Sequence, residues 1–273
     1  MGSLLKFFSL TYAVTWTCFI AAAALSGSVA SAVPALAGLR WPLLILGAFA
    51  PSTVALWLTA RADGSPGTRA LLRRVLSWRV GARWYGFALG YMAAIKLAVA
   101  LVHRVATGAW PRFGQEAWYV ILAATVVATV FGGPVGEEIG WRGYALPRLA
   151  ARFGLARGSV LLGPIWACWH LPLFFIPGLD QYGQSFPVYV LQVIALSIAM
   201  AWLYGHTNGS LLLAMLMHSA VNQSKDIVPS AVPAAMNPLA LSTSLVAWLT
   251  IALLWISAGY FLVRMPTAEL PRA

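Results

Sequence analysis

Long apolar runs constrain this chain more than any other feature of its sequence. Three of them, at 84–102, 187–204 and 245–263, approach the roughly 20 residues that a helix needs to cross a bilayer. Hydrophobic residues make up 60% of the chain and charged residues 9%, whereas a soluble domain carries roughly 25% charged residues. A soluble fold would expose far too much apolar surface, so the sequence predicts an integral membrane protein.

The apolar runs divide the chain into spans. We expect an all-α, polytopic membrane helix bundle of about eight transmembrane helices, in a single membrane domain covering residues 1–273. The run near the N-terminus is longer than the apolar region of a signal peptide, roughly 7 to 15 residues, so we expect it to be kept as the first span. The expected spans are 4–27, 41–60, 84–105, 118–141, 158–176, 187–205, 209–223 and 244–263, of which the seventh is short.

The net charge of +11 comes from basic clusters that flank the spans. This placement follows the positive-inside rule and does not indicate nucleic-acid binding. Both termini are therefore expected in the cytoplasm, with the loop around Asp180 outside. Membrane lipids are the expected partners of the basic clusters. These clusters comprise Arg61, Arg69, Arg73, Arg74, Arg79 and Arg83 in one loop, and Arg148, Arg152 and Arg157 in another.

Two further features of the sequence concern the membrane. In the stretch 66–82, leucines and a tryptophan alternate with arginines, which predicts a basic helix lying in the membrane interface. Alanine is abundant and arginine exceeds lysine, which indicates a GC-rich bacterial source. The expected location is a bacterial cytoplasmic (inner) membrane, crossed several times.

Two adjacent carboxylates, Glu137 and Glu138, follow the fourth apolar run, although the chain has only 7 acidic residues. Ionisable residues inside spans are costly and mark functional candidates. Arg142 lies four residues after Glu138 on the same helical face, so a salt bridge at a helix end is one interpretation. Such a bridge does not need Glu137, which favours a functional site. Residues 132–134 (Gly-Gly-Pro) allow a kink or a new helix, and if a helix begins at Pro134, its dipole would favour the two carboxylates in the first turn.

Two histidines, His170 and His218, lie in the fifth and seventh predicted spans. Trp166 precedes His170 by one helical turn, and Pro172 loosens the helix beside it. Asn222 follows His218 by one turn, so both side chains can face one cavity. Interhelical hydrogen bonding is the alternative interpretation for either histidine alone. The occurrence of all these groups in one half of the chain favours a shared site.

Two carboxylates and two histidines suit hydrolysis, because a carboxylate can take a proton from water while imidazoles bind a metal or polarise a carbonyl. Two histidines with one glutamate also form a known zinc ligand set. A Zn²⁺ ion is therefore one candidate cofactor, although no HExxH motif is present. The ligands available to such an ion are Glu137, Glu138, His170 and His218.

Two other functions compete with hydrolysis. An ion- or proton-coupled membrane transporter also places ionisable groups inside its spans. Such transporters commonly show inverted repeats, whereas here the first three spans contribute only Lys96 and the charges at their ends. The third possibility is a non-catalytic membrane scaffold that keeps the polar groups for structure.

Three motifs carry a resemblance to a known family. GEEIGWRGYALPRL at 136–149 resembles the EExxxR motif of the CAAX-protease and bacteriocin-processing (CPBP, Abi) family. WACWH at 166–170 is similar to the family's FxxxH motif, with Trp166 in place of phenylalanine, and HSAVN at 218–222 resembles its HxxxN motif. The motifs occur in the family's order within 131–222, and the core that contains them is placed at 118–223.

The resemblance implies an intramembrane endopeptidase similar to the type II CAAX prenyl proteases, whose eukaryotic members remove the last three residues of prenylated proteins. The implied substrate is a peptide or a lipidated protein. The mechanism is either that of a metalloprotease or one that depends on a glutamate. The physiological substrate is left open, because many bacterial members of the family have no assigned substrate.

The resemblance also implies roles for individual residues. Glu137 would activate water with His170 beside it, and His218 with Asn222 would bind the carbonyl oxygen or a metal. In the predicted topology, Glu137 lies towards the cytoplasmic end of its span, whereas both histidines lie beyond the middle of theirs, towards the outer side. A kinked or displaced helix is therefore needed to bring them into one site. The residues implied as catalytic are Glu137, Glu138, His170, His218 and Asn222, with Arg142 and Trp166 in support.

Overall fold

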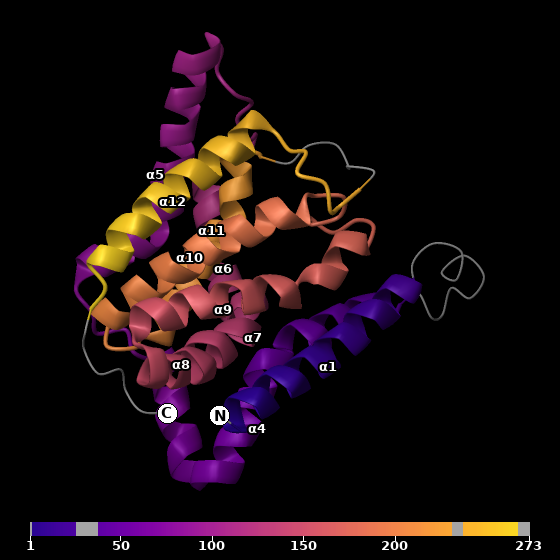
Figure 1. The fold of residues 1–273 in the computed structure, drawn as a ribbon, viewed down its shortest axis with the longest axis vertical. Coiled ribbons are helices and arrows are strands. Elements are labelled where there is room, and N and C mark those ends of the chain that lie inside the picture. Colours follow the sequence, from indigo (N-terminus) through magenta and orange to yellow (C-terminus); the bar gives the residue numbers. More distant parts are fainter. Residues whose placement is uncertain (1, 26–37, 231–236, 267–273) are drawn as a thin grey trace.

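The computed structural model describes residues 2–25, 38–230 and 237–266, which form an all-α bundle with no β-strand (Figure 1). Three short segments of other helical types join the α-helices: π-helical η1 (Trp141–Ala145) and the 3₁₀ segments η2 (Leu171–Phe175) and η3 (Ser224–Asp226). The α-helices are α1 (Gly2–Ala24), α4 (Arg40–Val75), α5 (Ala82–Thr107), α6 (Trp118–Phe131), α7 (Gly133–Gly140), α8 (Leu146–Phe153), α9 (Leu155–Trp169), α10 (Phe186–His206), α11 (Leu211–Gln223) and α12 (Leu245–Val263).

The described helices account for the predicted spans. Six segments are long and apolar enough to cross a membrane: α1, α4, α5, α10, α12 and the combined segment Leu155–Phe175. The bent pair of α6 and Gly133–Phe153 would make a seventh. The seventh predicted range, 209–223, contains α11, which has 13 residues and is the expected short helix. The prediction of a helical membrane bundle with about eight spans is therefore confirmed.

The fourth predicted span is broken where the glycines and the proline predicted a kink. Gly132 is extended (φ −97°, ψ −170°), and the helices on its two sides are bent by 52°. The new helix, α7, begins at Gly133 and not at Pro134. Glu137 and Glu138 consequently lie in its second turn. The expectation that the carboxylates lie in the first turn is therefore wrong, because the helix begins one residue earlier than Pro134.

The short helix α7 packs on α4 with almost no side chain between the two backbones. A Cβ atom added at Gly140 would lie 2.5 Å from the carbonyl oxygen of Pro51, and one added at Gly136 would lie 2.9 Å from a backbone oxygen of α4. The Ser52 hydroxyl donates to the Val135 carbonyl oxygen at 2.8 Å. Small residues at intervals of four allow this close approach in membrane helices. The contact fixes α7, and with it both glutamates, against α4.

The first helix ties α4 to α9 through a polar side chain. Thr15 of α1 donates to the Gly47 carbonyl oxygen at 2.8 Å and accepts from the Trp169 indole N–H at 2.8 Å. The Phe19 ring packs directly on Gly47, where a Cβ would lie 2.6 Å from the ring. Because Trp169 precedes His170 in the chain, α1 supports the end of α9 that carries His170.

The predicted basic helix at 66–82 is shorter than expected. Gly64 (φ 62°) divides α4, and the second part of this helix ends at Val75. Leu71 of this part is fully buried, and its side chain lies 2.8 Å from where a Cβ of Gly143 would be. The segment therefore packs against η1. Its position in the membrane interface stays a prediction.

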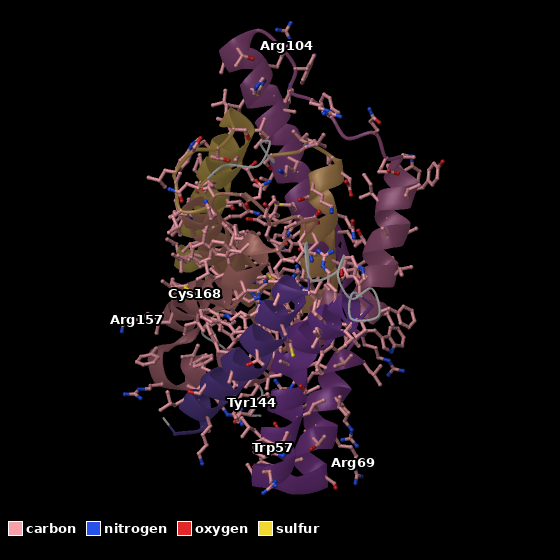
Figure 2. All side chains as sticks on the ribbon, turned by 90° about the vertical axis from the view of Figure 1, so that its right-hand side faces the viewer. Trp57, Arg69, Arg104, Tyr144, Arg157 and Cys168 are labelled. Atoms are coloured by element: carbon pink, nitrogen blue, oxygen red, sulfur yellow. The ribbon has the colours of Figure 1, made fainter. Side chains whose placement is uncertain are left out.

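The two ends of the bundle differ in the charges that they carry. Figure 2 shows Arg69 near one end of the molecule and Arg104 at the other. The end with Arg69 carries both arginine clusters, since α4 and α8 end there and α5 and α9 begin there. We call it the arginine-rich end. The opposite end carries mixed charges, namely Arg40, Arg104, Arg112, Glu116, Asp180, Lys225 and Asp226.

The close contact between α7 and α4 generates a prediction. We expect Gly140→Ala to lower the free energy of unfolding by about 1–3 kcal/mol, because the new methyl group overpacks the Pro51 backbone. The matched control is Gly90→Ala in α5, where an added Cβ meets no atom within 4 Å. Thermal unfolding in detergent measures both variants. If Gly140→Ala were as stable as Gly90→Ala, the two backbones would not be in contact.

Candidate active site

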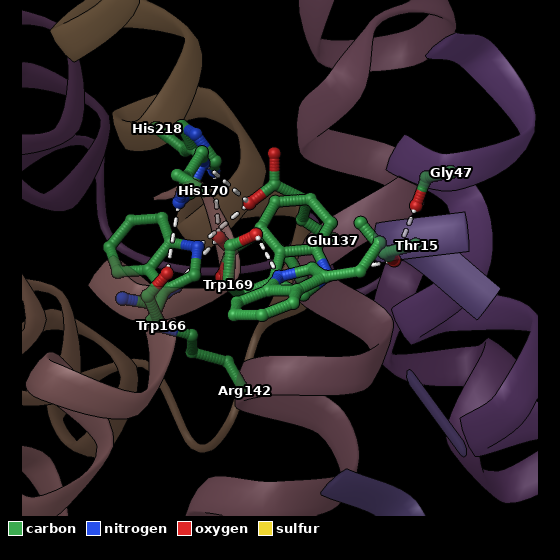
Figure 3. Close-up of polar contacts among 10 residues, drawn as sticks. Thr15, Gly47, Glu137, Arg142, Trp166, Trp169, His170 and His218 are labelled. Carbon is green, nitrogen blue, oxygen red and sulfur yellow. Dashed lines mark hydrogen bonds and ion pairs between the residues drawn. The ribbon is translucent and has the colours of Figure 1, made fainter. Parts of the chain in front are cut away.

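The buried carboxylate of Glu138 joins α7, η1 and α11, and Figure 3 shows the two side chains that bind it, Arg142 and His218. Oε1 of Glu138 accepts from Arg142 Nη1 at 2.8 Å and from His218 Nδ1 at 2.8 Å. Glu138 and Arg142 are both 0% exposed. The guanidinium of Arg142 also lies over the Trp166 ring, 4.0 Å from its centroid. This arrangement matches the predicted pairing of Glu138 with Arg142 and adds His218 to it.

The second carboxylate, Glu137, faces the side chains of the WACWH motif. Its Oε2 accepts from the Trp166 indole N–H at 2.8 Å and lies 3.8 Å from His170 Nε2. The kink at Gly132 thus brings Glu137 to the histidine end of α9, as a single site required. Trp166 links the two carboxylates, because its N–H binds Glu137 and its ring covers Arg142.

Hydrogen bonds fix which nitrogen of each histidine carries a proton. His170 Nδ1 lies 2.9 Å from the Trp166 carbonyl oxygen, which can only accept, so Nδ1 carries the proton. The unprotonated Nε2 then faces Glu137 across 3.8 Å. A single water molecule can bridge two such acceptors, at about 2.8 Å from each. His218 likewise donates through Nδ1 to Glu138, which leaves its Nε2 free.

A cavity of about 460 Å³ reaches these groups. Glu137, His170 and His218 line it together with Asn222, which lies one turn after His218 and is exposed. Its other end lies at the mixed-charge end of the bundle, where Lys225 forms an ion pair with Asp180. Four glutamine side chains also line the space: Gln181, Gln184, Gln192 and Gln223. Water therefore has a polar route to the carboxylate and the imidazoles.

The side chains of the site do not fit the zinc ligand set considered above. Among the described residues, no three histidine, cysteine, aspartate or glutamate side chains are grouped so that they could hold one metal ion. Oε1 of Glu138 is occupied by Arg142 and His218, and the remaining donors Glu137, His170 and His218 Nε2 are not grouped so that they could hold one ion. A catalytic zinc ion takes three protein ligands.

Some supporting residues were not identified from the sequence. Gly136 and Gly140 hold α7 against α4, and their four-residue spacing was the available signal. Tyr189 packs edge-on against His170, with ring centroids 5.5 Å apart, and Thr15 supports Trp169 from α1. No local pattern marks either residue, because both contacts join distant parts of the chain.

Comparison with known proteins agrees with the three motifs. Residues 118–224 match the sequence model of the family described as type II CAAX prenyl endopeptidase Rce1-like. A CAAX prenyl protease 2 from Methanococcus maripaludis is 33% identical over 98 residues, which cover 34% of this chain and 36% of that protein. The match thus spans about a third of the relative's length. The predicted resemblance is confirmed over this segment.

The two glutamates should differ in their effect on stability. We expect Glu138→Gln to lower the free energy of unfolding by about 3–5 kcal/mol, because Arg142 would stay buried without its charge partner. Glu137→Gln should change it by less than about 1 kcal/mol, since an amide oxygen still accepts from Trp166. Thermal unfolding of the detergent-purified variants measures both values. Equal losses would contradict the separate roles of the two carboxylates.

Proposed function

We propose that this chain, whose residues 118–224 match the type II CAAX prenyl endopeptidase family, hydrolyses peptide bonds of membrane-anchored substrates within the bilayer. Prenylated peptides are one such class of substrate. The observation that carries the proposal is the facing pair of Glu137 and His170 at a polar cavity among membrane helices. This pair can hold and deprotonate one water molecule.

The proposed reaction needs only side chains of the site. Glu137 takes a proton from a water held between its Oε2 and His170 Nε2, and the hydroxide adds to the scissile carbonyl carbon. The carbonyl oxygen gains the negative charge. When the C–N bond breaks, protonated Glu137 gives its proton to the leaving nitrogen, which yields a carboxylic acid and an amine.

The developing oxyanion needs hydrogen-bond donors. The side-chain amide of Asn222 is one donor in the cavity. His218 lines the same cavity, and its Nε2 can donate only while it carries a proton in addition to the one on Nδ1 that Glu138 binds. In this proposal Arg142 and Trp166 are positioning residues, since they contact the two glutamates. No feature of the described part of the chain favours the transporter alternative.

The proposal predicts that Glu137→Gln abolishes cleavage of a fluorogenic prenylated peptide in detergent, by at least about 100-fold, because the amide cannot accept the proton. The protein should stay folded, as judged by thermal unfolding. Glu116→Gln is the matched control, since Glu116 is exposed just before α6 and does not line the cavity of the proposed site. This control should cleave at the wild-type rate.

Retained activity in folded Glu137→Gln would refute the glutamate mechanism, and a folded wild type that cleaves no lipidated or transmembrane peptide would favour a scaffold. The metal content of the same preparations separates the two mechanisms. Stoichiometric zinc, lost together with activity in His170→Ala and His218→Ala, would favour a metalloprotease. Cleavage without bound metal would favour water activation by Glu137 with His170 beside it.

We place the protein in a bacterial cytoplasmic membrane with its arginine-rich end in the cytoplasm, in accordance with the positive-inside rule. The cavity then opens on the other side. In a Cys18→Ala/Cys168→Ala background, Lys225→Cys should react with a membrane-impermeant maleimide in intact cells. Arg157→Cys, at the start of α9, should react only after permeabilisation. The reverse result would invert the orientation.

A further inference from the structure

A lysine outside the three motifs lines the same cavity as the proposed catalytic groups. Lys96 of α5 is 3% exposed, and its Nζ donates to the Ser230 hydroxyl at 2.5 Å. Ser230 also lines the cavity, and its carbonyl oxygen accepts from the Ser244 hydroxyl at 2.7 Å. Ser244 is the N-cap residue of α12. The pair of Lys96 and Ser230 is therefore held by two helices.

Lys96 has no carboxylate partner among the described residues. The ion pairs there join Arg142 to Glu138, Lys225 to Asp180, and the two histidines of the site to the two glutamates. An ammonium has three N–H donors, and the Ser230 hydroxyl takes one of them. A buried cation without an anion is costly, and an ionisable residue facing a cavity within the membrane marks a binding site.

We propose that Lys96 and Ser230 form a subsite for the C-terminal carboxylate of the substrate, an inference that rests on the proposed function. Two donors converge there, because Ser230 accepts from Lys96 and keeps its own O–H to donate. Of the two lysines in the cavity, Lys225 is occupied by Asp180, which leaves Lys96 for an incoming anion.

The subsite assigns a direction to the bound peptide. With the scissile carbonyl at Glu137 and the terminal carboxylate at Lys96, the fragment that leaves is the short C-terminal one. The protein would then cut near free chain ends and would discriminate against internal bonds and blocked termini. This specificity follows from a charge on α5, outside the segment that matches the family.

The test compares two fluorescent probes in detergent: an S-farnesylated Cys-Val-Ile-Met peptide with a free carboxylate, and the same peptide as its C-terminal amide. Binding is measured by anisotropy on the folded Glu137→Gln protein, so the readout does not require turnover. We expect the acid to bind about 10- to 100-fold more tightly than the amide, as for a hydrogen bond to a charged group. In Glu137→Gln/Lys96→Met this ratio should fall to about one, with amide binding unchanged.

Two further variants serve as a rescue and as a control. Lys96→Arg should restore part of the preference for the acid, whereas Lys225→Met, which removes the lysine paired with Asp180, should leave the ratio intact. Equal binding of acid and amide to the Glu137→Gln protein would overturn the proposal. Displacement of either probe by phosphatidylglycerol alone, without an acid preference, would assign Lys96 to a lipid phosphate instead. Failure of wild-type cleavage with an intact acid preference would refute the proposed function and leave the subsite standing.

Discussion

Two side chains share one carboxylate oxygen at the centre of this bundle, and the geometry of the site depends on that contact. Oε1 of Glu138 receives Arg142 from η1 and His218 from α11, which joins the two ends of the motif segment. An ion pair at this depth has a large desolvation cost, so it is stable only while both charges remain in place. Because the neighbouring residue is Glu137, the position of one carboxylate sets the position of the other. The indole of Trp166 completes this coupling by touching Glu137 and Arg142 at once.

The backbone of α7 contributes as much to the site as its side chains do. The break at Gly132 ends α6, and the glycines that follow let α7 rest directly on α4. Five π-helical residues, Trp141–Ala145, then carry Arg142, and π-helical turns often occur at functional sites. A single straight span would leave Glu137 apart from His170. The irregular backbone is thus the means by which helices of opposite direction present their polar groups to one cavity.

Much of this arrangement could be predicted from the sequence. Hydropathy located all eight helical ranges, and Gly132 with Pro134 predicted the break, because both signals are local. The start of α7 at Gly133, the end of the basic helix at Val75 and the π-helical turn could not be read from local patterns. Tertiary packing decides them, as Leu71 on Gly143 shows. The partners of Glu137 and Lys96 also come from distant parts of the chain, 29 and 134 residues away. The spacing of residues within one helix cannot predict contacts between residues so far apart in the sequence.

In the proposed reaction, the polar lining of the cavity brings water to a substrate that is dissolved in the lipid. Hydrolysis consumes one water molecule for each bond cut, and the hydrocarbon core holds almost none. The glutamine side chains that line the cavity offer water a polar path from bulk solvent to Glu137, which lies at a fixed depth. A substrate held by its own membrane anchor is also set at a fixed depth. In the proposed reaction, only bonds for which these two depths coincide would meet the nucleophile, so the protein would select its cleavage point by position along the membrane normal.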